Sequence, residues 1–134
     1  MSRFFLLLLF TVSIFANEFA SVKQTFLKKD EEYKIVVKHA HFEKIFTLRW
    51  TLYTNEGLVL FHSYNKQVFQ NILYLNTRNQ SFKVYLKTKG ADFYETPYIL
   101  VKFEKFDFKK HKAHFKIFLS DKKGQMRLEY PKKK

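Results

Sequence analysis

The stretch FTLRWTL, residues 46–52, alternates strictly between apolar and polar side chains. Its apolar positions are Phe46, Leu48, Trp50 and Leu52, and its polar positions are Thr47, Arg49 and Thr51. A period of two is typical of a β-strand that covers a core with one face and meets water with the other. Residues 81–87 and 114–120 repeat the pattern, and no period of 3.6 persists. The alternation therefore predicts an antiparallel sheet over a core.

The rest of the chain fits the same class. Further candidate strands are residues 33–42, 58–64, 68–76, 98–108 and 126–130. Residues 17–29 fit either a short helix or a first strand. No repeat or change of composition divides the chain, so we predict one all-β domain over residues 17–130 and a mobile basic tail over residues 131–134. We expect an antiparallel β-sandwich or a curved, partly open barrel of about seven to nine strands.

The first predicted hairpin has a Gly-containing turn. Residues 54–57 (TNEG) open with polar side chains and close with glycine, where a positive φ is usual. This turn places Trp50 opposite Phe61, or opposite His62 if one strand carries a one-residue bulge, and the pattern leaves both registers open. A second irregularity is expected at residues 103–106, where the alternation changes phase and so predicts a bulge or bend.

The second predicted hairpin turns at residues 121–124 (DKKG). The expected pairs are Ser120 with Gln125, Leu119 with Met126, and Ile117 with Leu128. This register places the apolar members on one side of the sheet, as burial requires. The main loop is expected at residues 90–97.

Apolar positions of the alternating strands are predicted to be buried. The clearest examples are Leu48, Trp50, Leu86, Phe115 and Ile117. Aromatic residues make up 19% of the chain, a content typical of a folded protein rather than a disordered one.

The N-terminal segment indicates export. Arg3 precedes residues 4–16, FFLLLLFTVSIFA, which would span about 20 Å as a helix, short of the ~30 Å hydrocarbon core of a membrane. A basic start, a short apolar run and Ala16 are typical of a cleaved signal peptide, so residues 1–16 are assigned to it. A retained membrane anchor is the alternative. We expect a periplasmic or secreted protein that keeps all but one of its 25 Lys and Arg side chains.

Composition removes several classes of site. The chain has no Cys, which excludes disulfide scaffolds, zinc ribbons, iron–sulfur clusters and thiol catalysis. Only 3 Gly leave little material for a glycine-rich phosphate loop. Abundant Lys, Phe, Asn, Ile and Tyr are typical of an AT-rich bacterial genome, and in such a cell an exported protein enters the periplasm.

Histidines provide the weak candidates for a metal site. His39 and His41 would share one face of a strand and so reach one ion, and His62 could join from a neighbouring strand. The alternative is that they are surface histidines of a basic sheet. Because no metal-binding or nucleophile motif accompanies them, we predict no metal, no cofactor and no catalytic residue; an enzyme is the third alternative for function.

The strongest functional signal is charge. The chain has a formal net charge of +13, and residues 102–116 (KFEKFDFKKHKAHFK) are its most basic stretch. The candidate binding residues are Lys102, Lys105, Lys109, Lys110, Lys112 and Lys116. Cations between aromatic side chains bind anionic partners such as acidic proteins, lipid head groups or nucleic acid. Nucleic acid is disfavoured by export and by the absence of a known motif. The alternative is a core of Phe beneath a solvated Lys face.

Four short segments resemble parts of the periplasmic lipoprotein carriers of the outer-membrane sorting pathway. Residues 48–50 (LRW), 55–57 (NEG) and 64–68 (YNKQV) are similar to their Phe-Arg-Trp strand, Asp-Gly turn and Tyr-Asp…Gln-Val segment, and residues 20–25 are similar to their Phe-x-Gln segment. The likeness covers about a third of the chain and consists of general hairpin features, so it does not assign the chain to that family. It implies an open barrel around an apolar cavity.

These observations predict a non-enzymatic periplasmic binding or assembly protein that engages an anionic envelope partner through a basic face or a sheet edge. The alternative is a small carrier of lipid or another hydrophobic ligand. A filled core would favour the first function, and an empty apolar groove would favour the second.

Overall fold

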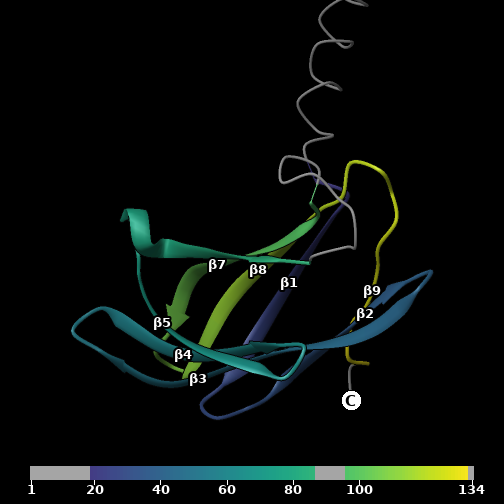
Figure 1. The fold of residues 1–134 in the computed structure, drawn as a ribbon. Helices are drawn as coiled ribbons and strands as arrows, with labels where there is room; N and C mark the ends of the chain where they lie inside the picture. The colour runs from purple at the N-terminus through teal and green to yellow at the C-terminus, as the bar shows by residue number, and fades with distance from the viewer. Residues whose placement is uncertain (1–18, 87–95, 133–134) are drawn as a thin grey trace, which may run out of the picture.

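A computed structural model describes residues 19–86 and 96–132. Within these ranges the chain forms nine β-strands and one short 3₁₀ turn (Figure 1), which confirms the predicted all-β class. Residues 1–16, assigned to a signal peptide, lie outside the described residues, as does most of the predicted loop at residues 90–97.

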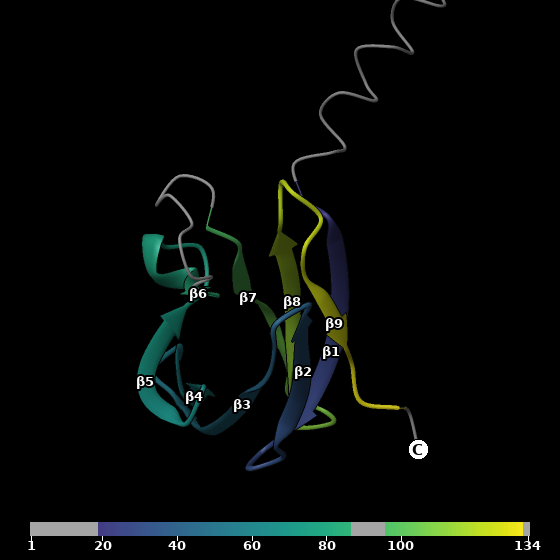
Figure 2. The ribbon, with the colours of Figure 1, turned by 45° about the vertical axis from the view of Figure 1, so that its right-hand side comes forward.

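Two antiparallel sheets form the fold (Figures 1 and 2). Sheet A has the strand order β1 (Ser21–Lys28), β8 (Lys112–Ser120), β7 (Tyr98–Asp107) and β6 (Ser81–Tyr85). Sheet B has the order β5 (Gln67–Tyr74), β4 (Gly57–Tyr64), β3 (Phe42–Thr54), β2 (Tyr33–His39) and β9 (Arg127–Glu129). The turn η1 (Arg78–Gln80) leads from β5 in sheet B to β6 in sheet A.

One core lies between the two sheets. The predicted core positions are confirmed: Leu48, Leu86, Phe115 and Ile117 are fully buried, and Trp50 is 3% exposed. Side chains from both sheets belong to the same buried cluster, which includes Phe46 from sheet B and Phe103 from sheet A. The alternating strands therefore bury their apolar faces against each other.

The predicted irregularity near residue 104 is a β-bulge. Phe103 pairs with Phe115, but the next paired residue is Lys105, opposite His114, so Glu104 is the extra residue. A bulge changes which side of the strand the following residues face. It lets both Phe103 and Phe106 pack against the core although they are three residues apart.

The first hairpin turns where predicted, but the positive φ is not at Gly57 and the register differs. Asn55 and Glu56 take the positive φ values, 51° and 66°, in a two-residue turn of the type that suits hairpins. Trp50 lies opposite Leu60, so neither predicted register is correct. The register shifts at Thr51, so the bulge is in β3 rather than in β4. The absence of a side chain at Gly57 leaves room for the Tyr74 ring, because a Cβ at residue 57 would lie 2.9 Å from that ring.

The second predicted hairpin is wrong. The turn itself exists: Gly124 has a φ of +62°, and the Met126 amide donates to the Asp121 carboxylate at 2.7 Å. However, β9 pairs with β2 in sheet B, so Leu128 lies opposite Val37 instead of Ile117. The turn carries the chain from one sheet to the other. Met126 is buried in the shared core in this arrangement too, so burial alone does not select the strand partner.

The N-terminal third also departs from the expected boundaries. The ambiguous segment at residues 17–29 contains a strand, β1, rather than a helix. The single strand expected over residues 33–42 is divided by a turn at residues 40–41, after which β3 begins. β3 is consequently 13 residues long and pairs with β2 on one side and β4 on the other.

Candidate functional site

The outer face of sheet A collects lysines from all four of its strands. They are Lys28 on β1, Lys112 and Lys116 on β8, Lys102 and Lys105 on β7, and Lys83 on β6. They face outward because the residues that alternate with them pack toward the core, as Phe115 does beside Lys116. We call this surface the basic face.

The structure brings together four of the six predicted binding residues. Lys102, Lys105, Lys112 and Lys116 belong to the basic face. Lys109 and Lys110 lie in the turn between β7 and β8, where their backbone N–H groups donate to the carboxylate of Asp107 at 3.0 and 3.1 Å. Lys28 and Lys83 were missed, because no local pattern links residues so far apart in the sequence.

Acidic side chains on this face neutralise part of the charge. The Glu104 carboxylate lies 3.6 Å from the Lys102 ammonium and 3.8 Å from that of Lys116. One carboxylate thus pairs with two ammonium groups, both near the upper distance limit for an ion pair. All three side chains are partly exposed. Ion pairs of this kind contribute little to stability.

His114 lies among these lysines as an uncharged ring. It is buried, its imidazole stacks on Phe26 with 4.2 Å between ring centroids, and neither ring nitrogen has a hydrogen-bond partner. Burial lowers the pKa of His114, the charges of Lys105 and Lys116 lower it further, and Glu104 opposes them. His114 therefore adds surface to the basic face without adding charge at neutral pH.

The aromatic side chains of the basic stretch have divided roles. Phe103 and Phe115 are core residues, as the alternative interpretation of the stretch predicts, whereas Phe108 is 69% exposed. The exposed rings on the basic face come from other strands: Phe26 on β1 and Tyr85 on β6. The Lys83 ammonium lies 4.7 Å from the ring centre of Tyr98, within reach of a cation–π interaction.

His39 and His41 do not form the predicted strand pair. β2 ends at His39, and His41 follows in the turn, where its N–H donates to Nδ1 of His39 at 3.2 Å. That bond engages one of the two ring nitrogens of His39. Over residues 19–86 and 96–132, no group of three or more His, Asp or Glu is placed to hold a metal ion. His62 lies elsewhere, in a cleft.

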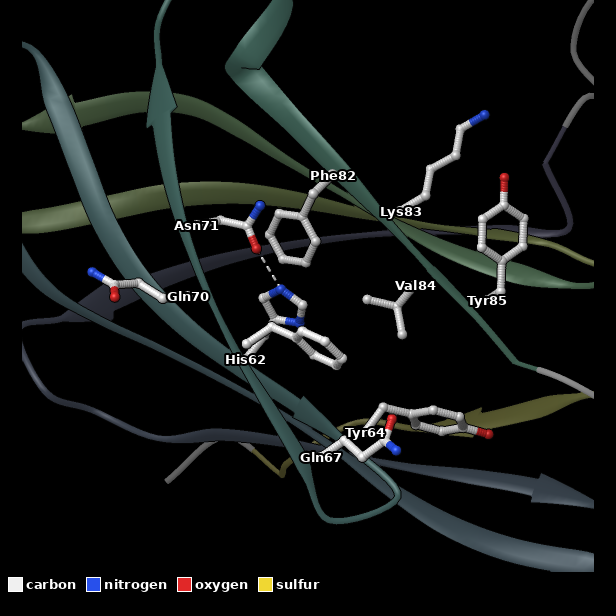
Figure 3. Close-up of a pocket in the computed structure, with 10 residues that line it drawn as sticks. His62, Tyr64, Gln67, Gln70, Asn71, Phe82, Lys83, Val84 and Tyr85 are labelled. Atoms are coloured by element: carbon white, nitrogen blue, oxygen red, sulfur yellow. Dashed lines mark hydrogen bonds between the residues drawn. The ribbon is translucent and has the colours of Figure 1, made fainter.

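This cleft is a second candidate site that the sequence did not indicate (Figure 3). It opens between the edge strands β5 and β6 and has a volume of about 480 Å³. His62 and Tyr64 of β4 lie at its base, and Nε2 of His62 is 2.6 Å from Oδ1 of Asn71 on β5. Phe82 stacks on His62 from the opposite sheet, with 4.2 Å between ring centroids.

Within residues 19–86 and 96–132, the structure has no helix that could span a membrane. Comparison with protein-family models, with curated proteins and with solved structures finds no match. The basic face and the cleft are therefore the two candidate functional surfaces of the described structure.

Proposed function

We propose that this protein is a non-enzymatic periplasmic binding or assembly protein that engages an anionic envelope partner through the basic face. The proposal includes cleavage after Ala16 and one folded unit over residues 17–130, packed as a β-sandwich. The observation that carries it is the placement of like charges directly opposite each other on neighbouring strands.

Two such pairs lie on the basic face. Lys102 is the cross-strand partner of Lys116, and Lys28 is the partner of Lys112. Like charges in directly opposed positions destabilise a sheet. Glu104 bridges the first pair, and Asp107 is the partner of Lys112 on β7, so these acids offset part of the repulsion. A partner that supplies further anions would relieve the rest, which supports binding through this face.

The field of the whole molecule acts in the same direction. The sequence carries 25 Lys and Arg against 12 Asp and Glu. A surface of one charge sign accelerates encounter with a partner of the opposite sign, and the effect falls with ionic strength. Binding through this face should therefore be sensitive to salt.

The test uses two triple variants with the same loss of charge. The basic-face variant is Lys28→Gln, Lys105→Gln and Lys112→Gln. The control is Lys34→Gln, Lys66→Gln and Lys122→Gln, which removes three exposed lysines that are not part of the strands of sheet A. Partners captured from envelope extracts are quantified by mass spectrometry at about 0.1 M and 1 M salt, where the Debye length is about 10 and 3 Å.

We expect wild type and control to capture the same anionic partner at low salt and to lose it at high salt, while the basic-face variant fails to capture it at low salt. Equal capture by all three proteins contradicts the proposal. In that case recognition would use an unpaired strand edge, which binds through main-chain hydrogen bonds.

The carrier alternative receives less support. The space between the sheets is occupied by side chains that are fully buried, including Phe46, Phe103 and Phe115. This is the filled core that favours a binding or assembly role. A carrier would have to use the cleft at one side instead of the core, so a hydrophobic ligand bound in the cleft would favour the carrier alternative.

A further inference from the structure

The cleft has the size and the walls of a small-molecule site. Its volume of about 480 Å³ falls within the ~300–1,000 Å³ typical of such sites. Phe69 of β5 and Phe82 and Val84 of β6 supply apolar walls from the two sheets. In Figure 3 Phe82 and Val84 extend from β6 toward His62, while Lys83 and Tyr85 extend from the other side of that strand. The lining also includes polar side chains, among them His62, Gln67 and Asn71, so the cleft has both apolar walls and polar groups.

One of those polar groups is a hydrogen-bond acceptor without a donor. The side-chain oxygen of Asn71 only accepts, so Nε2 of His62 must donate the proton in their 2.6 Å bond. The neutral ring then carries a lone pair on Nδ1, and this atom is buried with no partner. His62 as a whole is 6% exposed. A buried acceptor left unpaired costs free energy that a donor would recover.

The second polar group is the hydroxyl of Tyr64, which can donate or accept. It is also buried and has no partner, and the residue is 9% exposed. Burial raises its pKa to about 12, so the group is uncharged at neutral pH. In Figure 3 the Tyr64 ring extends away from His62, so the acceptor that the cleft offers beside its apolar walls is Nδ1 of His62.

We propose that the cleft binds an uncharged amphiphile, an apolar chain that ends in a hydroxyl group. The hydroxyl donates to Nδ1 of His62, and the chain packs between Phe69, Phe82 and Val84. This ligand fits better than an anion, because a carboxylate only accepts and would face the Nδ1 lone pair. Lys83 does not offset that repulsion, since its ammonium lies over the Tyr98 ring.

Phe69 borders His62 and is the mobile part of the cleft wall. This side chain is 51% exposed and stacks on the imidazole with 5.5 Å between ring centroids. Exposed side chains change rotamer on the picosecond to nanosecond scale. Rotation of Phe69 away from His62 widens the cleft beside the imidazole, after which the Phe69 ring can pack on the bound chain.

The test compares two probes that differ in their head group. The purified protein, labelled with ¹⁵N at histidine, is titrated with 1-decanol and with sodium decanoate and followed by NMR. We expect saturable binding of decanol with a change in the Nδ1 resonance of His62 that is typical of a new hydrogen bond. Decanoate should bind at least about tenfold more weakly, a difference of about 1.4 kcal/mol.

Two variants assign the binding to the cleft. Val84→Phe fills the space between the walls and should weaken decanol binding at least tenfold. His62→Phe keeps the stacked ring and removes Nδ1, so it should weaken decanol binding and reduce the preference for decanol over decanoate. Equal binding of decanol and decanoate to the wild type, or decanol binding without a change at Nδ1, would overturn the proposal. The wild-type spectra decide this even if a variant fails to fold.

The inference does not depend on the basic face. The triple variant at Lys28, Lys105 and Lys112 should bind decanol as the wild type does, and Val84→Phe should capture the envelope partner as the wild type does. If the proposal for one site is overturned, the result for the other site can still be interpreted.

Discussion

The two sides of the molecule are built differently although both are made of the same alternating strands. On the closed side, where β1, β2 and β9 lie, the Trp50 indole N–H donates to the Leu27 carbonyl at 2.7 Å and so joins sheet B to sheet A. The Asp30 amide in turn donates to the Trp50 carbonyl at 2.9 Å, and the Lys23 ammonium lies 5.5 Å from the Tyr130 ring centre.

On the open side, β5 and β6 are the edges of their sheets and no ladder joins them in the described structure. Here His62 and Tyr64 each keep a buried polar atom without a partner. The difference teaches that burial of the core does not require both sides to be bonded together. The closed side has the Trp50–Leu27 hydrogen bond between the sheets, whereas the open side has the cleft. A buried hydroxyl without a partner occurs on the closed side too, at Tyr130, so unpaired polar atoms alone do not mark the binding site.

The largest effect should come from the core that both sides share. Phe115→Ala removes a fully buried ring on β8 and should lower the free energy of unfolding by about 3–5 kcal/mol. Phe108→Ala, at a ring that is 69% exposed, is the matched control and should change it by less than about 0.5 kcal/mol. Urea unfolding measures both. Similar losses in the two variants would contradict the assignment of faces on β7 and β8.

The closed side is tested by Trp50→Phe. Phenylalanine keeps an apolar ring but cannot donate to the Leu27 carbonyl, which would be left unpaired in a buried position. We expect a loss of about 1–3 kcal/mol in the free energy of unfolding. A loss below about 0.5 kcal/mol would show that the inter-sheet hydrogen bond does not hold the closed side together.

On the open side, the equivalent loss of a polar group should not lower the free energy of unfolding. Tyr64→Phe removes a buried hydroxyl that has no partner, so the variant should be as stable as the wild type or more stable by up to about 1 kcal/mol. The same unfolding experiment checks this result. If Tyr64→Phe loses as much stability as Trp50→Phe, then the two sides do not differ in the way described.

The smallest expected effect is the pH dependence of the free energy of unfolding. Burial lowers the pKa of His62 below its usual 6.5, and the hydrogen bond with Asn71 only partly opposes this. The unfolded chain then binds the proton more readily than the folded one. Stability should therefore be flat above pH 6.5 and should fall as the pH drops through 6.5 toward the lower folded pKa.

The pKa of His114, on the basic face, is lowered too, with burial as the first cause. The two histidines are separated by the variants His62→Phe and His114→Phe, each unfolded in urea between about pH 5 and pH 8. Each variant should reduce the slope below pH 6.5 relative to the wild type. An unchanged slope in His62→Phe would mean that this ring is protonated as easily in the folded protein as in the unfolded chain.

The amino-acid sequence by itself determined the properties that depend on neighbours along the chain. Alternation predicted the strands and the buried faces, including Trp50 and Phe115. A change of phase predicted the bulge at Glu104. These predictions succeed because side chains of a strand point to opposite faces, so a run of six or seven residues already shows which face is buried.

Tertiary structure alone decided which strands are neighbours. β9 pairs with β2 rather than β8, Lys28 and Lys83 join the basic face, and two edge strands meet across the cleft. Burial does not distinguish between these pairings. Met126 is buried in the core with β9 paired to β2, and pairing with β8 would place it on the core side as well. The choice depends on main-chain hydrogen bonds and side-chain packing between segments far apart in the chain, and a local pattern carries no information about them.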